Sequence, residues 1–311
     1  MTPSVSGPGA ATPDGILVVD KPVGPTSHDV VALVRRLSGV RRVGHGGTLD
    51  PFARGVLPVF IGRATRLVEY HQADAKGYRA TVVFGAASTT DDLEGELIPG
   101  SAPAPDRAAL EAALGGFSGE IDQRPPAFSA VKVAGRRAYR AARAGEPLEL
   151  PERRVTIEHL ELLEWDAAEL GRPVAVLAIG CSAGTYVRSL ARDLGERLGC
   201  GGYLAALTRT ASGPFTLGGA SPLEEVRARF AAGEGSTLLL PPDAGLERFP
   251  RLALTAAEVA AVARGQVIRA AATLPRGPHE RLRLTDGERL VAIARVAGGR
   301  LHPEKVLVET A

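Results

Sequence analysis

The sequence predicts an α+β fold with a central mixed or antiparallel sheet, followed by a smaller C-terminal unit. A chain of 311 residues is long enough for two domains of ordinary size. Its content of 45% hydrophobic and 23% charged residues is typical of a folded globular protein. Stretches with strand and helix patterns are mixed along the chain, without the regular alternation that builds a parallel α/β sheet.

The first elements follow a segment, residues 1–13, whose Pro, Gly, Ser and Thr content predicts a disordered tail. Residues 15–22 (GILVVDKP) are a short apolar run that ends at a proline–glycine turn, which predicts a strand. We expect Ser27 to cap the next helix. Its apolar stripe consists of Val30, Val31, Val34 and Leu37.

The middle of the chain contains three runs rich in β-branched and apolar residues, which predict strands at 78–84, 153–165 and 172–182. Residues 185–199 instead have helical spacing, and Gly199 is placed to end that helix. The apolar residues that share one face of it are Val187, Leu190, Ala191, Leu194 and Leu198.

A second unit is predicted over residues 248–311, after a Pro-rich linker at 240–250. Thr255 and Glu258 match a capping box that opens a short helix, which ends at Gly265. Within residues 281–296, the pair Asp286-Gly287 is a strong hairpin signal. One helix and several strands in so short a segment predict a small β-barrel-like module.

Several functional classes are made improbable by what the sequence lacks. It has no apolar stretch of 18 residues and no signal-peptide pattern at its start, so we expect a cytoplasmic protein without membrane association. Its two cysteines, Cys181 and Cys200, are not expected to build a disulfide framework or a four-ligand zinc site. Phosphate-loop, dinucleotide-binding, HExxH and CxxC motifs are missing and the histidines are nowhere spaced as metal ligands, which argues against nucleotide hydrolysis, hydride transfer and zinc chemistry.

Charge is distributed in blocks, although the net charge is only +2. Residues 21–70 and 123–143 are predominantly basic, whereas residues 85–122 are predominantly acidic. Such blocks cancel in the total and still allow a basic face that binds nucleic acid. Solvated loops of opposite sign explain the pattern equally well.

The run GHGGTLDPFARGVLPVFIGRATRL, residues 44–67, holds the best candidate for chemistry. Three glycines within four positions allow a sharp turn and a close approach to a ligand. They precede Asp50, whose neighbour Pro51 disfavours helix at that position. Because arginines flank the run on both sides, we expect Asp50 to be ionised with a lowered pKa, as a nucleophile or an electrostatic stabiliser. The alternative is a tight turn in which the aspartate caps a backbone amide.

This run resembles the catalytic motif of the TruB family of tRNA pseudouridine synthases. Four further segments resemble that family in the same order, and a fifth, residues 249–268, is similar to the opening of a PUA RNA-binding domain. The four are KPVGPTS (21–27), KGYRA (76–80), QRPPAFSAVKVAGRRAYRAAR (123–143) and CSAGTYVRSLARDLGERLGCGGYLAALTR (181–209). The chain departs from the family at Gly46, Phe52 and Arg63, where Thr or Ser, Leu, and Glu are usual.

The resemblance implies a reaction and a set of catalytic residues. The reaction is the isomerisation of uridine 55 to pseudouridine in the T loop of tRNA, without a cofactor, on a base flipped out of the RNA. Asp50 is then the essential carboxylate, and Arg188 is the arginine that pairs with it. Tyr78 stacks on the uracil or assists proton transfer, Leu207 packs against the base, and His45 helps to fill the space that the flipped nucleotide leaves. Which atom Asp50 attacks stays open.

The resemblance also implies how RNA is held. Residues 14–247 correspond to the catalytic domain, in which 123–152 is an insertion that clamps RNA, and 248–311 to a PUA-like RNA-binding domain. Basic side chains in these parts are expected to contact phosphates. Those assigned to substrate binding are Lys21, Arg124, Lys132, Arg136 and Arg137.

The leading interpretation is a monomeric, stand-alone bacterial enzyme that binds the T arm of tRNA and needs no protein partner. One alternative is the related guide-RNA-dependent synthase, which works with accessory proteins. The other is a protein that binds or folds RNA without catalysis. The set Asp50, Tyr78 and Arg188 argues against the second alternative, because binding alone does not need it.

Overall fold

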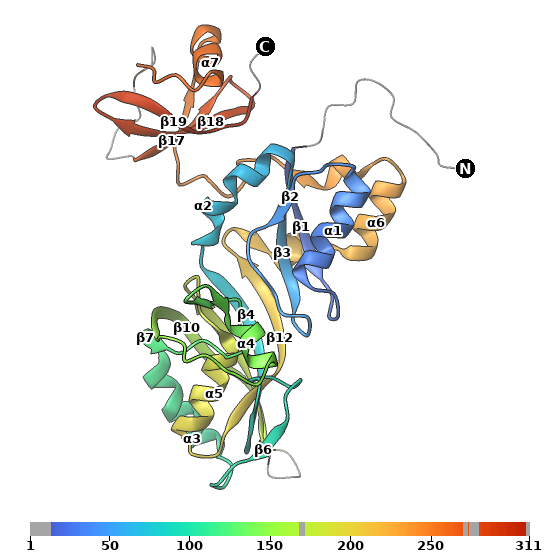
Figure 1. Ribbon diagram of the computed structural model, residues 1–311, viewed down its shortest axis with the longest axis vertical. Coiled ribbons are helices and arrows are strands. Elements are labelled where there is room, and N and C mark those ends of the chain that lie inside the picture. Colours follow the sequence, from blue (N-terminus) through green and yellow to red (C-terminus); the bar gives the residue numbers. More distant parts are fainter. Residues whose placement is uncertain (1–13, 168–171, 270–272, 274–279, 309–311) are drawn as a thin grey trace.

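A computed structural model describes residues 14–167, 172–269, 273 and 280–308 of the chain. The tail predicted at 1–13 lies outside these residues. Figure 1 shows an elongated molecule, with a small C-terminal unit next to one end of a longer body. Within the described ranges, no helix is both long enough and apolar enough to cross a membrane.

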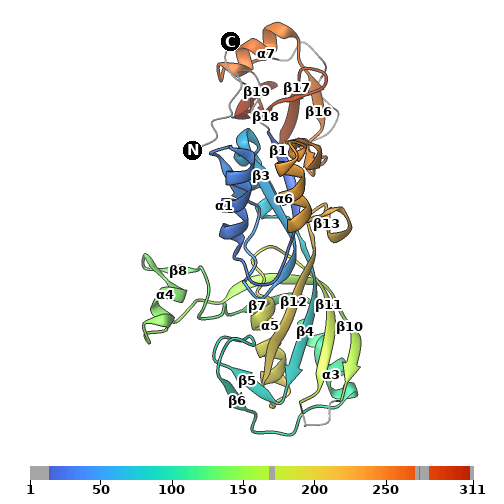
Figure 2. The same cartoon turned by 90° about the vertical axis from the view of Figure 1, so that its right-hand side faces the viewer.

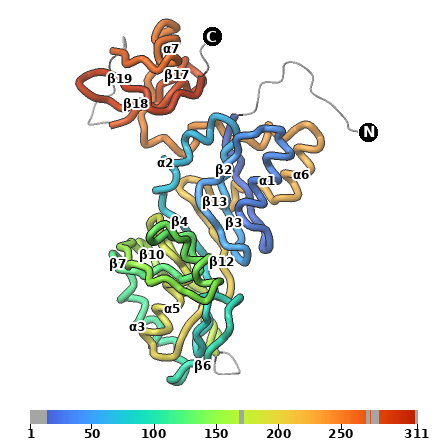
Figure 3. Tube along the Cα trace, in the orientation of Figure 1, coloured from blue at the N-terminus to red at the C-terminus, as the bar shows by residue number. Residues whose placement is uncertain are grey.

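The body is built on one mixed sheet of eleven strands, which confirms the predicted α+β class. Its main order is β14-β1-β3-β12-β4-β11-β10-β7, and β2, β13 and β15 pair at its sides. Most neighbours are antiparallel, whereas β1–β14 and β3–β12 are parallel. Figure 3 shows the consequence for the chain: the blue N-terminal strands lie beside the yellow strand β12, from residues far along the sequence.

The strands of this sheet have the following bounds: β1 Gly15–Lys21, β2 Val43–His45, β3 Arg54–Ile61, β4 Lys76–Phe84, β7 Gly119–Gln123, β10 Arg153–Asp166, β11 Val174–Cys181, β12 Gly202–Ser212, β13 Phe215–Thr216, β14 Ser221–Pro222 and β15 Leu239–Leu240. The helices of the body are α1 Ser27–Ser38, α2 Val68–Gln72, α3 Arg107–Leu114, α4 Ala138–Arg143, α5 Val187–Arg197 and α6 Leu223–Ala231. The short 3-10 segments are η1 Gly62–Leu67, η2 Gly115–Phe117, η3 Leu217–Gly219 and η4 Gly235–Leu238. Two small hairpins, β5 Ala86–Ser88 with β6 Leu97–Pro99 and β8 Lys132–Val133 with β9 Arg136–Arg137, stand apart from the sheet.

The cap of α1 differs from the prediction. Thr26, not Ser27, is the N-cap, because its hydroxyl accepts from the Asp29 amide at 3.1 Å while the Asp29 carboxylate accepts from the Thr26 amide at 2.9 Å. This reciprocal capping box satisfies two amides at once. Ser27 is buried and accepts instead from the amide of Leu49 at 2.8 Å. The predicted capping residue therefore contacts a distant loop.

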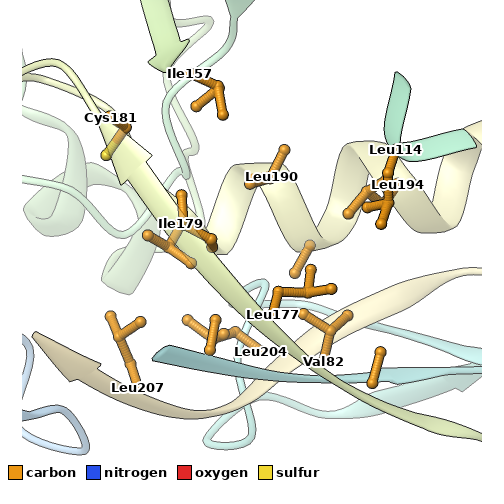
Figure 4. Close-up of a cluster of buried hydrophobic side chains, with 14 of the residues drawn as sticks. Val82, Leu114, Ile157, Leu177, Ile179, Cys181, Leu190, Leu194, Leu204 and Leu207 are labelled. Atoms are coloured by element: carbon orange, nitrogen blue, oxygen red, sulfur yellow. The ribbon is translucent and has the colours of Figure 1, made fainter. Parts of the chain in front are cut away.

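The strands and the helix predicted in the middle of the chain are confirmed as β4, β10, β11 and α5. Leu190 and Leu194 of α5, Leu177 of β11 and Leu204 of β12 belong to one cluster of buried side chains, which Figure 4 shows. Gly199 follows the helix with φ +73°, a conformation that glycine adopts without strain. This core fixes the first turn of α5 against the middle of the sheet.

The C-terminal unit contains β16 Arg251–Ala253, α7 Ala256–Ala263, β17 Arg281–Thr285, β18 Leu290–Ala297 and β19 Arg300–Val306. Its four strands form a separate sheet in the order β16-β17-β18-β19. Both sequence signals are confirmed: Thr255 and Glu258 form a capping box, and Asp286-Gly287 lies in the β17–β18 hairpin. The described residues of this unit form a small sheet with one helix. The helix and the strands of the predicted module are therefore observed.

The small unit packs against the body through an apolar cluster with a polar rim. Leu290, Ile293 and Leu307 contact Leu67 and Leu246 of the body. Arg63 takes part in the rim: it pairs with Asp14 at 3.3 Å and donates to the carbonyl of Leu307 at 2.8 Å. The departure from the family at this position therefore lies at the contact between the two units.

The predicted insertion, residues 123–152, connects two paired strands. β7 ends at Gln123 and β10 begins at Arg153, and these two residues are register partners. Between them the chain forms β8, β9 and α4, which project from the body in Figure 2. We call residues 124–152 the arm.

Candidate active site

A cleft of about 680 Å³ opens against strands β4 and β12 of the sheet. Its other walls are the loop 46–51, the start of α1, the connection from β11 to α5, and part of the arm. Of the catalytic residues expected from the sequence, Asp50, Tyr78, Arg188 and Leu207 all line it. Residues more than 150 positions apart in the chain are thus brought to one site.

Asp50 and Arg188 form an ion pair at one side of the cleft. The Nε of Arg188 lies 3.0 Å from Oδ2 of Asp50, and its Nη2 donates to Oδ1 at 3.3 Å. A bidentate contact of this kind fixes the orientation of the carboxylate as well as its charge. Arg188 is only 7% exposed, whereas Asp50 is 34% exposed and open to the cleft.

The surroundings of Asp50 correct one expectation. The sequence predicted a lowered pKa, but burial raises the pKa of Asp50 above its ordinary value. The Arg188 guanidinium opposes this rise, and the nearby carboxylate of Asp92 adds to it. The arginines that flank the run in the sequence did not predict this pKa correctly, because most of them lie away from the Asp50 carboxylate in space. The loss of solvent around Asp50 outweighs the one cation in contact with it, Arg188.

Tyr78 and Leu207 come from the neighbouring strands β4 and β12. Leu207 is 7% exposed and belongs to the main core, with one side toward the cleft. Burial raises the pKa of the Tyr78 hydroxyl, and Arg209 beside it opposes the rise. An aromatic ring and a leucine on one wall suit the face of a planar base.

The loop that carries Asp50 is held by side chains beneath it. Lys21 is fully buried, and its Nζ donates to the carbonyls of Pro22 at 2.9 Å, Pro25 at 2.8 Å and Pro51 at 3.4 Å. Burial lowers its pKa to about 8. Lys21 was expected to bind substrate, but a fully buried amine cannot be a surface ligand for phosphate. The structure places it under the loop as a support.

The remaining predicted substrate-binding residues lie around the cleft rather than together in it. His45 ends β2, packs edge-on against His28 with ring centres 5.4 Å apart, and does not line the cleft. Arg137 is the arm residue among those predicted that does line it. The exposed side chains of Lys132 and Arg136 lie on the arm, Arg136 beside Glu146 at 2.8 Å, while Arg124 pairs with Glu152 at 3.3 Å.

Three residues of the site were missed by sequence reasoning: Lys76, Asp92 and Arg209. Lys76 and Arg209 line the cleft, and both stand in segments whose resemblance to the family was noted. Asp92 is buried, and its Oδ2 lies 3.4 Å from Nη1 of Arg188. It belongs to the acidic block at 85–122, where nothing in the sequence distinguishes it from its exposed neighbours.

Across the described part of the chain, no group of three His, Cys, Asp or Glu side chains is arranged to hold a metal ion.

Two family models match the chain. The TruB family pseudouridylate synthase N-terminal domain matches residues 35–187, and the tRNA pseudouridylate synthase B C-terminal domain matches residues 188–247. Together they cover all of the predicted catalytic residues that line the cleft, and most of its other lining residues.

Comparison with whole proteins gives the same result as the family models. A tRNA pseudouridine synthase B from Synechococcus sp. (strain WH7803) is 51% identical over 249 residues, which are 79% of this chain and 82% of that protein. The protein of the same name from Thermobifida fusca (strain YX) is 49% identical over 260 residues, 82% of this chain and 86% of the relative. One similar solved structure is that of an archaeal box H/ACA sRNP Nop10–Cbf5 complex, with a TM-score of 0.72, 26% identity, and coverage of 96% of this chain and 88% of that one.

The matched models span more than half of the residues, and relatives near 50% identity extend over about four-fifths of them. Both results agree with the mixed sheet and with a cleft built around a paired aspartate and arginine. The chain therefore belongs to the TruB family of pseudouridylate synthases.

Proposed function

We propose that this protein isomerises uridine 55 to pseudouridine in the T loop of tRNA. The observation that carries the proposal is the bidentate pair of Asp50 with Arg188, open to a cleft that Tyr78 and Leu207 line. The relatives named tRNA pseudouridine synthase B support the choice of tRNA as substrate.

The reaction rearranges bonds within one nucleotide. The bond from N1 of uracil to C1′ of the ribose breaks, the base turns, and C5 bonds to C1′. C5 then loses its proton and N1 gains one, so that atoms and electrons balance without a co-reactant. The cleft must hold a detached base long enough for it to turn, and a walled site of about 680 Å³ has room for a nucleotide.

Each lining residue has a role that its position supports. Asp50 is the essential carboxylate, acting at the ribose C1′, on the base or on a ribose proton. Arg188 orients Asp50 and keeps it ionised against the effect of burial. The Tyr78 ring stacks on the uracil and its hydroxyl is placed to move the C5 proton, while Leu207 supports the base from β12. His45 packs on His28, which lines the cleft, and from there helps to fill the space of the flipped nucleotide.

Two parts of the chain bind the RNA in this proposal. Residues 14–247 form the catalytic domain, and its arm, with the exposed cations Lys132, Arg136 and Arg137, contacts phosphates next to the target base. Residues 248–311 form a PUA-like domain that adds affinity. Lys21 is reassigned to supporting the Asp50 loop, since its amine is bound to three carbonyls.

We further infer that the enzyme acts as a cytoplasmic monomer, with no cofactor, guide RNA or protein partner. The guide-dependent alternative is favoured by one observation, the similarity in fold to Cbf5 in its complex with Nop10. The higher identity of the relatives named tRNA pseudouridine synthase B, 49–51% against 26%, favours independent action.

One assay separates these alternatives. The purified chain is incubated with an unmodified tRNA transcript alone, and pseudouridine is located by carbodiimide modification and primer extension. Formation at position 55 without guide RNA supports the proposal. No product alone, but product with a guide RNA and accessory proteins, supports the guide-dependent alternative. Binding without product under either condition supports a non-catalytic RNA-binding protein.

A further inference from the structure

A buried arginine lies directly beneath the loop that carries Asp50. Arg209, in β12, is 1% exposed, and its guanidinium donates to three backbone carbonyls. These are Val56 from Nε at 2.7 Å, Thr48 from Nη1 at 3.2 Å and Gly47 from Nη2 at 3.2 Å. Among the described residues, no carboxylate forms an ion pair with Arg209, so its charge is compensated by these carbonyl dipoles and by the Tyr78 hydroxyl beside it.

The three carbonyls belong to the two sides of the Asp50 turn. Gly47 and Thr48 precede the aspartate, and Val56 follows it in β3. One rigid, planar group therefore ties the incoming chain to the outgoing strand. A lysine at the same place has its donors on a single nitrogen and cannot span these carbonyls in the same way.

Arg209 completes a continuous set of contacts along the loop. The carbonyl of Leu49 accepts from the Ser27 hydroxyl at 3.2 Å, and that of Asp50 accepts from the Ala53 amide at 3.1 Å. The carbonyl of Pro51 accepts from the Gly24 amide at 2.8 Å. With Arg209 on Gly47 and Thr48, every carbonyl from 47 to 51 is bound, and these bonds restrain the position of the loop.

The same guanidinium lies beside the second catalytic candidate. Arg209 is the register partner of Tyr78 across β12 and β4. The titratable groups that act on the Tyr78 hydroxyl are Arg209, Cys181 and Asp50, and of these the arginine alone favours the ionised form. Lys76, which also lines the cleft, donates to the carbonyls of Asp74 at 2.7 Å and His71 at 3.4 Å.

We propose that Arg209 is a further positioning residue of this active site, which holds the loop of Asp50 at its reacting position and lies beside Tyr78. It works through these two residues and through the loop. The inference rests on the proposed function, because it needs a reaction whose rate depends on where Asp50 stands. A displacement of about 1 Å in a reacting group costs roughly 100-fold in rate.

The test compares Arg209→Gln and Arg209→Lys with the wild-type chain under single-turnover conditions at saturating protein, on an unmodified tRNA transcript. We expect Arg209→Gln to lower the rate about 100-fold while the Kd for tRNA changes less than about threefold. Arg209→Lys should recover part of the rate, since it restores the charge and only part of the bonding. Because loss of the cation raises the pKa of Tyr78, the alkaline part of the pH–rate profile should move to higher pH in the glutamine variant.

The control for a general loss of packing is Arg283→Gln. Arg283, whose side chain is 11% exposed, lies in β17 of the C-terminal unit and donates to the Phe249 carbonyl and the Asp243 carboxylate. Thermal unfolding followed by circular dichroism is measured for all variants. If Arg209→Gln does not fold, the folded Arg209→Lys variant tests the proposal instead. A reduced rate together with a shifted pH–rate profile then supports the positioning role, and a wild-type rate and profile refute it.

The outcomes separate the two proposals. A wild-type chain that makes no pseudouridine refutes the proposed function. An active wild type whose folded Arg209→Gln variant keeps its rate within about threefold refutes the positioning role. The positioning role is also refuted if Arg209→Gln and Arg283→Gln lose rate in the same proportion to their loss of stability and the pH–rate profile of Arg209→Gln is unchanged. That is the behaviour of a purely structural arginine.

Discussion

Asp92 contacts Arg188 on the side that faces away from Asp50, with Oδ2 of Asp92 3.4 Å from Nη1 of the arginine. The guanidinium thus lies between two carboxylates, one 4% exposed and the other open to the cleft. Asp92 holds the arginine in place and, as a like charge, raises the pKa of Asp50. Substitution of Asp92 is informative because it removes both effects. Arg188 is then held less well, which lowers the rate, whereas the pKa of Asp50 falls, which favours its ionised form.

Asp92→Asn should move the acid limb of the pH–rate profile to lower pH. The ionised form of Asp50 is the active one, and removing a neighbouring negative charge lowers the pKa of Asp50. The plateau rate should fall about tenfold because Arg188 loses one anchor. Single-turnover rates measured from pH 5 to pH 9 test this, and a limb that stays in place or moves upward contradicts it.

Arg188→Gln should move the same limb in the opposite direction. Without its cation, Asp50 keeps the penalty of burial and the repulsion of Asp92, so its pKa rises further and protonation inactivates it at higher pH. Loss of the cation that Asp50 and the buried Asp92 share should also destabilise the fold by about 3–5 kcal/mol. Urea unfolding measures the second effect. The double variant with Asp92→Asn should recover part of the lost stability, and no recovery would show that the two residues are not coupled.

Asp50→Asn should abolish turnover and leave tRNA affinity within a few-fold of the wild type. The carboxylate does the chemistry, whereas many cations bind phosphate. We expect the single-turnover rate to fall at least about 10,000-fold, since no other lining residue replaces an essential carboxylate. Asp122→Asn, at an exposed aspartate that pairs with Arg154, is the matched control and should keep the wild-type rate. A rate for Asp50→Asn within tenfold of the wild type removes Asp50 from its role.

Chelation should leave the activity unchanged. The motive is that the described residues contain no cluster of metal-ligating side chains, and that the proposed reaction needs no group beyond the chain itself. Turnover is measured after dialysis against EDTA, with native gels of the tRNA as the control for its folding. Activity that is lost while the tRNA remains folded, and that one divalent ion restores, overturns the prediction.

Deletion of residues 249–311 should weaken tRNA binding more than it slows single-turnover chemistry, but the structure limits this experiment. Leu290, Ile293 and Leu307 pack against the body, so the deletion exposes apolar surface, and circular dichroism must first show that the shortened chain folds. Undiminished affinity of a folded, shortened chain contradicts the proposed RNA-binding role.

A gentler test of the same role is the double variant Arg264→Glu/Arg269→Glu, at two exposed residues of the C-terminal unit. Arg276, which the sequence also places in this unit, lies outside the described residues. The double variant should raise the Kd and reduce the slope of log Kd against log salt by about one for each arginine that no longer binds a phosphate. The rate at saturating protein should not change. An unchanged Kd and salt slope would show that these two arginines do not bind RNA.

Much of the local structure and the identity of the central residues could be read from the sequence. Apolar runs and helical spacing are local properties of the chain, and they correctly predicted β4, β10, β11 and α5. The capping box at Thr255 and the hairpin at Asp286 were equally local, and the ordered motifs pointed to Asp50, Tyr78, Arg188 and Leu207, which the structure brings to one cleft.

What only the tertiary structure decided concerns burial and long-range contact. Ser27 had the features of a helix cap and instead binds Leu49, and Lys21 looked like a phosphate ligand although its amine is buried among carbonyls. Asp92 could not be distinguished from the acids around it until the fold placed it on Arg188. The predicted direction of the Asp50 pKa shift was wrong for the same reason: the free energy of a charge depends on how much solvent it loses and on which single charge it touches, and neither is a property of its neighbours along the chain.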